Sequence, residues 1–432
     1  MLDGLRHKVT MAFARQLTKH ADERRYLYRL TMDPAVAADP FPLYEELRGR
    51  GPVVVTKGGA LVTGYDAAMA LYRDNRLGHG HEPQPSPLQR WLLPDHYADL
   101  VHPLEPPSMI SVDPPAHTRY RKLVSRAFSV KKIDALAPRV AELADGLLED
   151  LLRDPHADVM TGYAAQLPVL VIADVLGVPL RDQALFKEWG YDVARTLDSN
   201  MTWAEVKAAK TSLIKLNTYF DEAFAQRRIE PRADLLTALV QAEVDGETLS
   251  RDELLSTALL LLVAGFETTV NLLGNAITHV CADPELQRKA AEADDVWWDR
   301  IVEETLRFDS PVQFASRIVL EPGVTVEGVD LEVGQAALIS IGAANRDPAV
   351  FDEPHRFRPD RELKPHLAFA NGIHFCLGAA LARLEGRIGL QRLFRVAPHL
   401  RLGTPVRRPS PLLRGYRSMP ADLDPRRAPV GT

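Results

Sequence analysis

The most apolar stretch of the chain begins at Leu254 and continues to Val280. Almost every position up to Val263 is apolar, which predicts a helix that is buried on all sides. Ser250 and Glu253 have the spacing of a capping box directly before it, where the helix should start. At 1.5 Å per residue, such a helix would extend about 40 Å. We therefore expect it to cross the whole domain, and we expect no membrane span because polar residues interrupt the apolar run.

The rest of the pattern alternates helical periodicity with short strand-like runs. Residues 52–63 contain two valine- or alanine-rich runs around Gly58-Gly59, which predicts a β-hairpin. Prolines recur between 77 and 115, so we expect a long irregular loop there. Further elements are expected as follows: helices ending near Arg50 and Asn75, a helix opening at 113–121, successive helices over 134–230, a helix from Asp294, short strands within 324–331 and 335–341, and a helix over 377–388. The predicted fold class is mainly α with small β-sheets.

The composition is that of a large globular protein. The 432 residues are 46% hydrophobic and 25% charged, and neither a linker nor an internal repeat divides them. The net charge of -6 argues against a nucleic-acid partner. Charges interrupt the first thirty residues, and the two cysteines lie far apart, so we expect a cytoplasmic protein without disulfides. Val9, Phe13 and Leu17 could form one face of an N-terminal helix that packs on the domain, lies on a membrane surface or frays.

One of the two cysteines, Cys376, lies in a loop bracketed by glycines. Gly372 and Gly378 would let the backbone turn tightly and a flat group approach it. Apolar residues at 377, 381, 384 and 388 predict a helix immediately afterwards. The free N–H groups and the dipole at that helix end favour a thiolate, and such a sulfur suits an axial haem ligand. Two alternatives remain: a small buried hydrophobic residue, or a nucleophile paired with a distant histidine.

This loop resembles the haem-binding signature of the cytochrome P450 family, Phe-x-x-Gly-x-His-x-Cys-x-Gly. The matching residues are Phe369, Gly372, His374, Cys376 and Gly378, and one departure is Ala370, where the family usually has glycine. The resemblance implies the cytochrome P450 fold, with haem b buried beside the long central helix and Cys376 on the iron. It covers about residues 34–420, which we expect to form one catalytic domain between an N-terminal extension (1–33) and a tail (421–432).

Polar residues enter the central helix at Glu267 and Thr268, directly after Ala264 and Gly265. Such groups are costly in an apolar helix unless they are paired or functional, although Thr268 could simply donate to a backbone carbonyl of its own helix. The segment resembles the oxygen-binding motif of the same family. The resemblance implies that Ala264 and Gly265 leave room for dioxygen, and that Thr268, with Glu267 linking to water, relays protons to it.

Further segments resemble the haem-propionate contacts of the family. His117 and Arg121 are four residues apart and share a helix face, which could also be an ordinary solvated face. The resemblance implies that both contact a propionate, and it implies the same for Arg317 and His374.

Glu304 and Arg307, three residues apart, resemble the structural Glu-x-x-Arg pair of the family. An exposed pair of this kind is common and contributes little. The resemblance implies that this pair is buried behind the haem and joined by an arginine from a Pro-x-Arg-Phe motif, here Arg356.

The function implied by the resemblance is that of a haem-thiolate monooxygenase of the soluble bacterial type. It would insert one oxygen atom from O₂ into a small apolar molecule, with specialised-metabolite tailoring as the first hypothesis, using electrons from ferredoxin and an NAD(P)H-dependent ferredoxin reductase. Two alternatives remain: the same centre used for coupling, desaturation or peroxide-driven oxidation, and a haem binder without turnover. Candidate residues of an apolar substrate pocket are Trp91, Met109, Leu260, Val312, Phe314 and Leu412.

Overall fold

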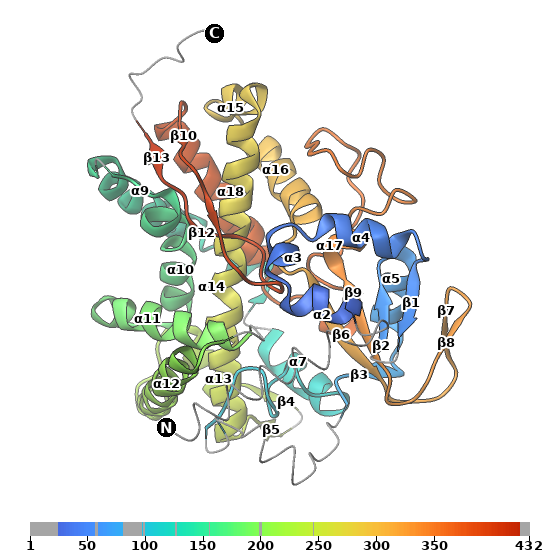
Figure 1. Cartoon of the computed structure of the whole chain (residues 1–432). Coiled ribbons are helices and arrows are strands. Elements are labelled where there is room, and N and C mark those ends of the chain that lie inside the picture. Colours follow the sequence, from blue (N-terminus) through green and yellow to red (C-terminus); the bar gives the residue numbers. More distant parts are fainter. Residues whose placement is uncertain are drawn as a thin grey trace.

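The computed structural model describes residues 25–56, 59–80, 97, 100–125, 128–154, 156–197, 201–244 and 246–423. Helix α14 (Arg251–Ala282) runs through the middle of this structure (Figure 1). Its N-terminus has the predicted capping box, because the Ser250 hydroxyl accepts the Glu253 N–H and the Glu253 carboxylate accepts the Ser250 N–H. The prediction of one long central helix is confirmed.

Burial decides how the apolar character of α14 should be interpreted. By length and composition the helix could cross a membrane. However, 83% of its most apolar 18-residue window is buried inside the protein. Such burial is typical of a core helix that other helices surround.

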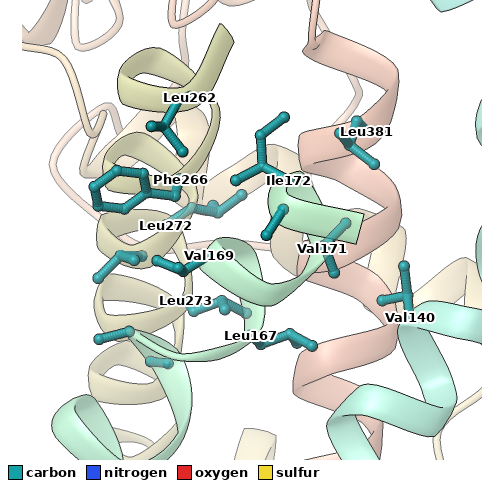
Figure 2. Close-up of a cluster of buried hydrophobic side chains, with 14 of the residues drawn as sticks. Val140, Leu167, Val169, Val171, Ile172, Leu262, Phe266, Leu272, Leu273 and Leu381 are labelled. Atoms are coloured by element: carbon teal, nitrogen blue, oxygen red, sulfur yellow. The ribbon is translucent and has the colours of Figure 1, made fainter. Parts of the chain in front are cut away.

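Most of the helices pack around α14, and α10, α16 and α18 contact it directly. Their side chains form one large apolar core, part of which is shown in Figure 2, where Leu262 and Phe266 of α14 meet Val169 and Ile172 of α10. The helices of this part are α7 (Ala116–Ser125), α8 (Val130–Asp134), α9 (Ala137–Arg153), η3 (Met160–Ala164), α10 (Leu167–Leu176), η4 (Leu180–Asp182), α11 (Gln183–Ala194), η5 (Arg195–Leu197), α12 (Trp203–Ile229), α13 (Leu235–Val240), α15 (Pro284–Ala290), α16 (Asp295–Phe308), η6 (Gly372–His374) and α18 (Ala379–Val396).

A five-stranded sheet lies to one side of the helices (Figure 1). Its strand order is β1-β2-β9-β6-β3, with β2 and β9 parallel and the other neighbours antiparallel. The strands are β1 (Val53–Thr56), β2 (Gly59–Val62), β3 (Leu77–Gly78), β6 (Phe314–Val319) and β9 (Ala336–Ser340), so the predicted hairpin is confirmed. Four two-stranded pairs complete the β structure: β4 (Glu243–Val244) with β5 (Glu247–Thr248), β7 (Val324–Val326) with β8 (Val329–Leu331), β10 (Arg401–Leu402) with β13 (Ala421–Asp422), and β11 (Val406–Arg407) with β12 (Tyr416–Ser418).

The segments next to the expected limits of the domain, residues 34 and 420, pack against the rest of the structure, and the limits themselves stay a prediction. Helix α2 (Arg25–Met32) buries Tyr26 and Leu30 in a cluster that also contains residues of the following helices and of β2. At the other end, Leu402 of β10 pairs with Ala421 of β13. Both segments therefore belong to the packed body. The remaining helices beside the sheet are α3 (Pro34–Ala38), α4 (Phe41–Arg48), α5 (Tyr65–Arg73) and α17 (Ile341–Ala344).

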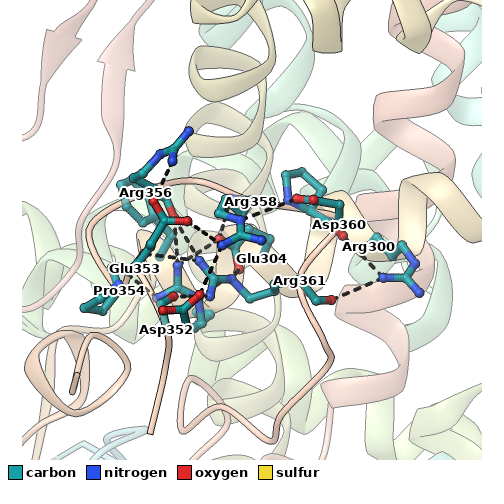
Figure 3. A network of polar contacts seen from close by, with 12 residues as sticks. Arg300, Glu304, Asp352, Glu353, Pro354, Arg356, Arg358, Asp360 and Arg361 are labelled. Carbon is teal, nitrogen blue, oxygen red and sulfur yellow. Dashed lines mark hydrogen bonds and ion pairs between the residues drawn. The ribbon is translucent and has the colours of Figure 1, made fainter. Parts of the chain in front are cut away.

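Glu304 of α16 is the centre of a buried polar network (Figure 3). Its carboxylate accepts two bonds from Arg307, at 2.8 Å each, and one from Arg361 Nε, also at 2.8 Å. The backbone N–H of Arg358 adds a fourth bond at 2.7 Å. All the acceptor positions of this buried carboxylate are thus used, and the network ties α16 to the irregular segment after α17.

The prediction that Arg356 joins this pair is wrong, since Arg361 does so. The Arg356 side chain is 69% exposed and pairs with Glu353 at 2.5 Å. What Arg356 contributes is its backbone carbonyl, which accepts bonds from Arg307 and Arg361. The Arg356 side chain thus points outward, whereas the carbonyl of the same residue points into the network.

Candidate functional site

The cysteine loop is shaped by its close contact with α5. Gly372 has φ +69°, and a Cβ there would lie 2.1 Å from the Tyr72 carbonyl oxygen, so only glycine fits. The Asn371 side chain accepts the Gly372 N–H and starts the short helix η6. The Cys376 N–H donates to the Phe369 carbonyl at 3.0 Å, which closes the loop. The sulfur is thereby held between η6 and the first turn of α18.

Ala370 has φ 56°, which explains why glycine is favoured at this position. A left-handed conformation costs an L-residue about 1–2 kcal/mol, whereas glycine loses about 0.5–1 kcal/mol in chain entropy. We therefore expect Ala370→Gly to raise the free energy of unfolding by about 0.5–1 kcal/mol. Urea unfolding would measure this, with Ala368→Gly, at a residue without positive φ, as a control that should lower stability. A loss of stability in Ala370→Gly would contradict the strain.

Cys376 is exposed, yet protein surrounds it closely enough that burial raises its pKa. A sulfur that borders an internal space satisfies both observations. The Gly378 N–H donates to the sulfur, and Arg121 and Arg383 lie near it; each of these lowers the pKa without offsetting burial. The predicted thiolate is therefore not produced by the helix terminus alone. A bound metal cation would supply the missing stabilisation, since coordination deprotonates a thiol.

Four of the predicted propionate contacts form one cluster next to the cysteine loop. The rings of His117 and His374 lie 4.2 Å apart between centroids, and Arg317 is close enough to lower the pKa of both. Arg121 donates to the Phe375 carbonyl at 2.5 Å. Burial, followed by these positive charges, lowers the pKa of His374 to about 2. The structure thus brings together residues from α7, β6 and the loop that the sequence separates widely.

This cluster has cations and donors but few acceptors. Neither Arg121 nor Arg317 forms an ion pair with a carboxylate in the described part of the chain, and burial lowers the pKa of both. Both ring nitrogens of His117 and Nε2 of His374 are buried without a hydrogen-bond partner there. Native structures seldom leave such groups unsatisfied. A group that carries carboxylates, such as a haem with its two propionates, fits what this cluster lacks.

The structure adds two residues to the cluster that the sequence did not single out. The His79 ring lies edge-on to His374, with 4.9 Å between centroids. The Tyr72 ring lies under the Arg317 guanidinium at 5.6 Å. No motif marks either residue, because each reaches the site only through the pairing of β3 with β6 and the packing of α5.

Helix α14 is interrupted in its burial at the predicted oxygen-binding segment. Ala264 is exposed and Thr268 half-buried, although the residues on both sides of this turn are buried. The two positions are four apart and share a face, so this face adjoins an open space. The Thr268 hydroxyl donates to the Ala264 carbonyl at 3.0 Å, as the structural alternative proposed. Its oxygen can still accept a further bond.

Gly265 lies where α14 packs against α10. A Cβ at this position would lie 3.1 Å from Ile172 on α10, so the absent side chain lets the two helices pack closely. Figure 2 shows Ile172 in this core. The predicted room for dioxygen at Gly265 stays a prediction, and Ala264 is the exposed residue of this turn.

Glu267 is buried, and its partner is Arg408, with which it forms an ion pair. Arg408 follows β11, and its Nε also donates to the Tyr416 carbonyl at 3.3 Å. The predicted link from Glu267 to water is not tested by these contacts. They show that an arginine 141 residues away pairs with this carboxylate.

Comparison with known proteins decides the family. The sequence model of the family described as Cytochrome P450 matches residues 191–398. "Putative cytochrome P450 140" of Mycobacterium tuberculosis is 41% identical over 410 residues, covering 93% of both chains. "Vitamin D(3) 25-hydroxylase" of Pseudonocardia autotrophica is 40% identical and covers 90% of this chain and 95% of its own. The chain belongs to the cytochrome P450 family. A solved cytochrome P450, CYP164A2 of Mycobacterium smegmatis, superposes with a TM-score of 0.80 at 34% identity over 92% of this chain and 99% of its own.

As a cytochrome P450, the protein is a haem b monooxygenase that uses O₂ and electrons from redox partners. The observed fold, a long central helix with small sheets, agrees with the family assignment. Of the residues suggested for this cytochrome P450's substrate pocket, Trp91 lies outside the described residues. Val312 and Leu412 come together where Val312 bridges Leu413, and Phe314 follows in β6. Met109 and Leu260 are buried in the main core, Leu260 as part of α14.

Proposed function

We propose that Cys376 is the axial ligand of the haem iron and that His117, Arg121, Arg317 and His374 hold its propionates. The observation that carries this proposal is the cysteine's position: Cys376 is exposed although protein surrounds its thiol, and it lies next to a cluster whose buried histidine nitrogens have no hydrogen-bond partner in the described structure. Once bound, the haem would supply the dioxygen chemistry. The chain's own part is to position the cofactor, to exclude bulk water and to deliver protons.

We propose that Thr268 relays protons at the open face of α14 and that the Glu267 carboxylate supports this relay. Thr268 lies on the open face of α14, and its hydroxyl already has a fixed direction because it donates to Ala264. The Glu267 carboxylate is paired with Arg408 and lies one residue before Thr268. A hydroxyl and a carboxylate are both suited to transferring protons in a site that excludes bulk water.

The substrate in this proposal is a small apolar molecule that is hydroxylated or epoxidised, and specialised metabolism is the expected setting. The apolar residues around α14 support an apolar ligand, and the hydroxylase name of the vitamin D(3) relative supports C–H oxidation of one. We further propose that ferredoxin and its reductase supply the electrons and that the enzyme works in the cytoplasm. The burial of α14 inside the protein supports a location away from membranes.

The test of this proposal is the absorption spectrum of the purified, reduced protein under carbon monoxide. We expect a strongly red-shifted Soret band that Cys376→Ala abolishes. Cys281→Ala is the matched control, since it removes the other cysteine, at the end of α14, and should leave the band intact. A protein without haem, or a band of the histidine-ligated kind, would overturn the assignment of Cys376.

A further inference from the structure

His79 stands at the end of β3, beside the residues proposed for the propionates. The pairing of β3 with β6 places Gly78 opposite Ile318, and Arg317 precedes Ile318 in the same strand. The ring of His79 meets that of His374 edge-on, and His374 in turn meets His117. Three imidazoles and a buried guanidinium thus come from four separate segments of the chain to one place.

Asp113 fixes the backbone that carries His79. Its carboxylate accepts the N–H groups of His79 and Gly80, at 2.9 and 3.0 Å. Gly78 is needed for this contact, because a Cβ there would lie 2.3 Å from Asp113 Oδ1. The backbone that carries the ring therefore cannot move away from this place without breaking two charge-assisted hydrogen bonds.

The buried Nε2 of His79 has no hydrogen-bond partner within the described structure. The same holds for the Tyr72 hydroxyl, for both nitrogens of His117 and for Nε2 of His374. Asp113 is the carboxylate that acts on this cluster electrostatically, and its oxygens already accept the two backbone N–H groups. His79 therefore lacks a hydrogen-bond acceptor for Nε2, as do His117 and His374, the two histidines that the sequence motifs mark.

We propose that His79 is a third haem-anchoring histidine, which donates a hydrogen bond from Nε2–H to a propionate carboxylate. This inference rests on the proposed function, since it needs haem in this site. Burial and then the nearby Arg317 lower the pKa of His79 to about 4, so the ring is a neutral donor near pH 7. The competing explanation is that the His79 ring only packs against His374. In that case the shape of the ring, and not its N–H donor, would contribute to haem retention.

The experiment measures how fast the haem-loaded protein loses haem to an excess of apomyoglobin. His79→Phe keeps a ring for packing but removes the donor, and we expect it to lose haem about tenfold faster than the unmodified protein, as for a lost bond to a charged acceptor. His79→Gln keeps an N–H donor without a ring and should restore most of the retention. His355→Phe, at a half-exposed histidine outside the cluster, should change nothing.

The opposite order, with His79→Phe normal and His79→Gln impaired, would overturn the proposal in favour of packing. Equal haem loss in all four proteins would overturn it as well. Reconstitution with haem dimethyl ester gives an independent check, because blocking the propionates should accelerate haem loss less in His79→Phe than in the unmodified protein. The carbon monoxide spectrum of each sample separates the role of His79 from the proposed ligation of the haem iron by Cys376. A normal thiolate band with unaltered haem loss rejects only the role of His79.

Discussion

Replacing Arg361 with methionine should lower the free energy of unfolding by about 3 kcal/mol, which is typical when one partner of a buried ion pair is removed. Glu304 and Arg361 are 2% and 8% exposed, and their contact at 2.8 Å is one of four bonds to this carboxylate. Without Arg361, one lone pair of a buried charge has neither protein nor water as a partner. Methionine fills much of the same volume, so a cavity should add little.

Arg356→Met is the matched control, because it makes the same chemical change five residues earlier. The Arg356 side chain is 69% exposed, and its backbone carbonyl remains available to Arg307 and Arg361. We expect a change within about 0.5 kcal/mol, as for most surface substitutions. Urea unfolding of the haem-loaded proteins, followed by circular dichroism, would measure both. Equal losses in the two variants would contradict the assignment of Arg361 to the network.

Thr268→Ala should reduce the product formed per NAD(P)H consumed by about tenfold or more, since a positioned group that takes part in proton transfer contributes at least this much to catalysis. The electrons that do not reach product should appear as hydrogen peroxide. The fold should be unaffected, because the hydroxyl bonds only to the Ala264 carbonyl of its own helix. Surrogate ferredoxin partners and a substrate found by spin-state screening would allow both products to be measured.

Thr269→Ala is the control for Thr268→Ala, since it removes the neighbouring hydroxyl from the same helix. Thr269 is buried and donates to the Gly265 carbonyl at 3.4 Å, on a different face of α14 from Thr268. The Thr269→Ala variant should retain the normal yield of product per NAD(P)H consumed. If Thr268→Ala left the yield unchanged, the proposed proton delivery would fail.

Features that depend on neighbouring residues were predictable from the sequence. The apolar run and the capping box specify α14, because helical hydrogen bonds and cap bonds join residues three or four apart. The glycines on both sides of Cys376 likewise predicted a tight turn, although the contact with Tyr72 of α5 that requires glycine at 372 became visible only in the folded structure. The family resemblance then indicated the haem and the monooxygenase activity, both in agreement with the comparisons.

Other features depend on which segments meet, and local periodicity carries no information about that. Arg356 and Arg361 are both near Glu304 in the folded chain, and only the path of the backbone turns one outward and the other inward. The pairing of Glu267 with Arg408 joins residues 141 positions apart. The absence of a side chain at Gly265 lets Ile172 of α10 approach α14 closely. His79 reaches the cluster of His117, Arg317 and His374 through the pairing of β3 with β6.

The amino-acid sequence was thus sufficient for most elements of this protein and for the place of Cys376 directly before α18, because those follow from spacing along one segment. The partners of the buried charges, the contact of Gly265 with α10 and the position of His79 required the folded structure. The physical reason is that a buried polar or charged group is stable only with its partners in place, and packing brings those partners from distant parts of the chain.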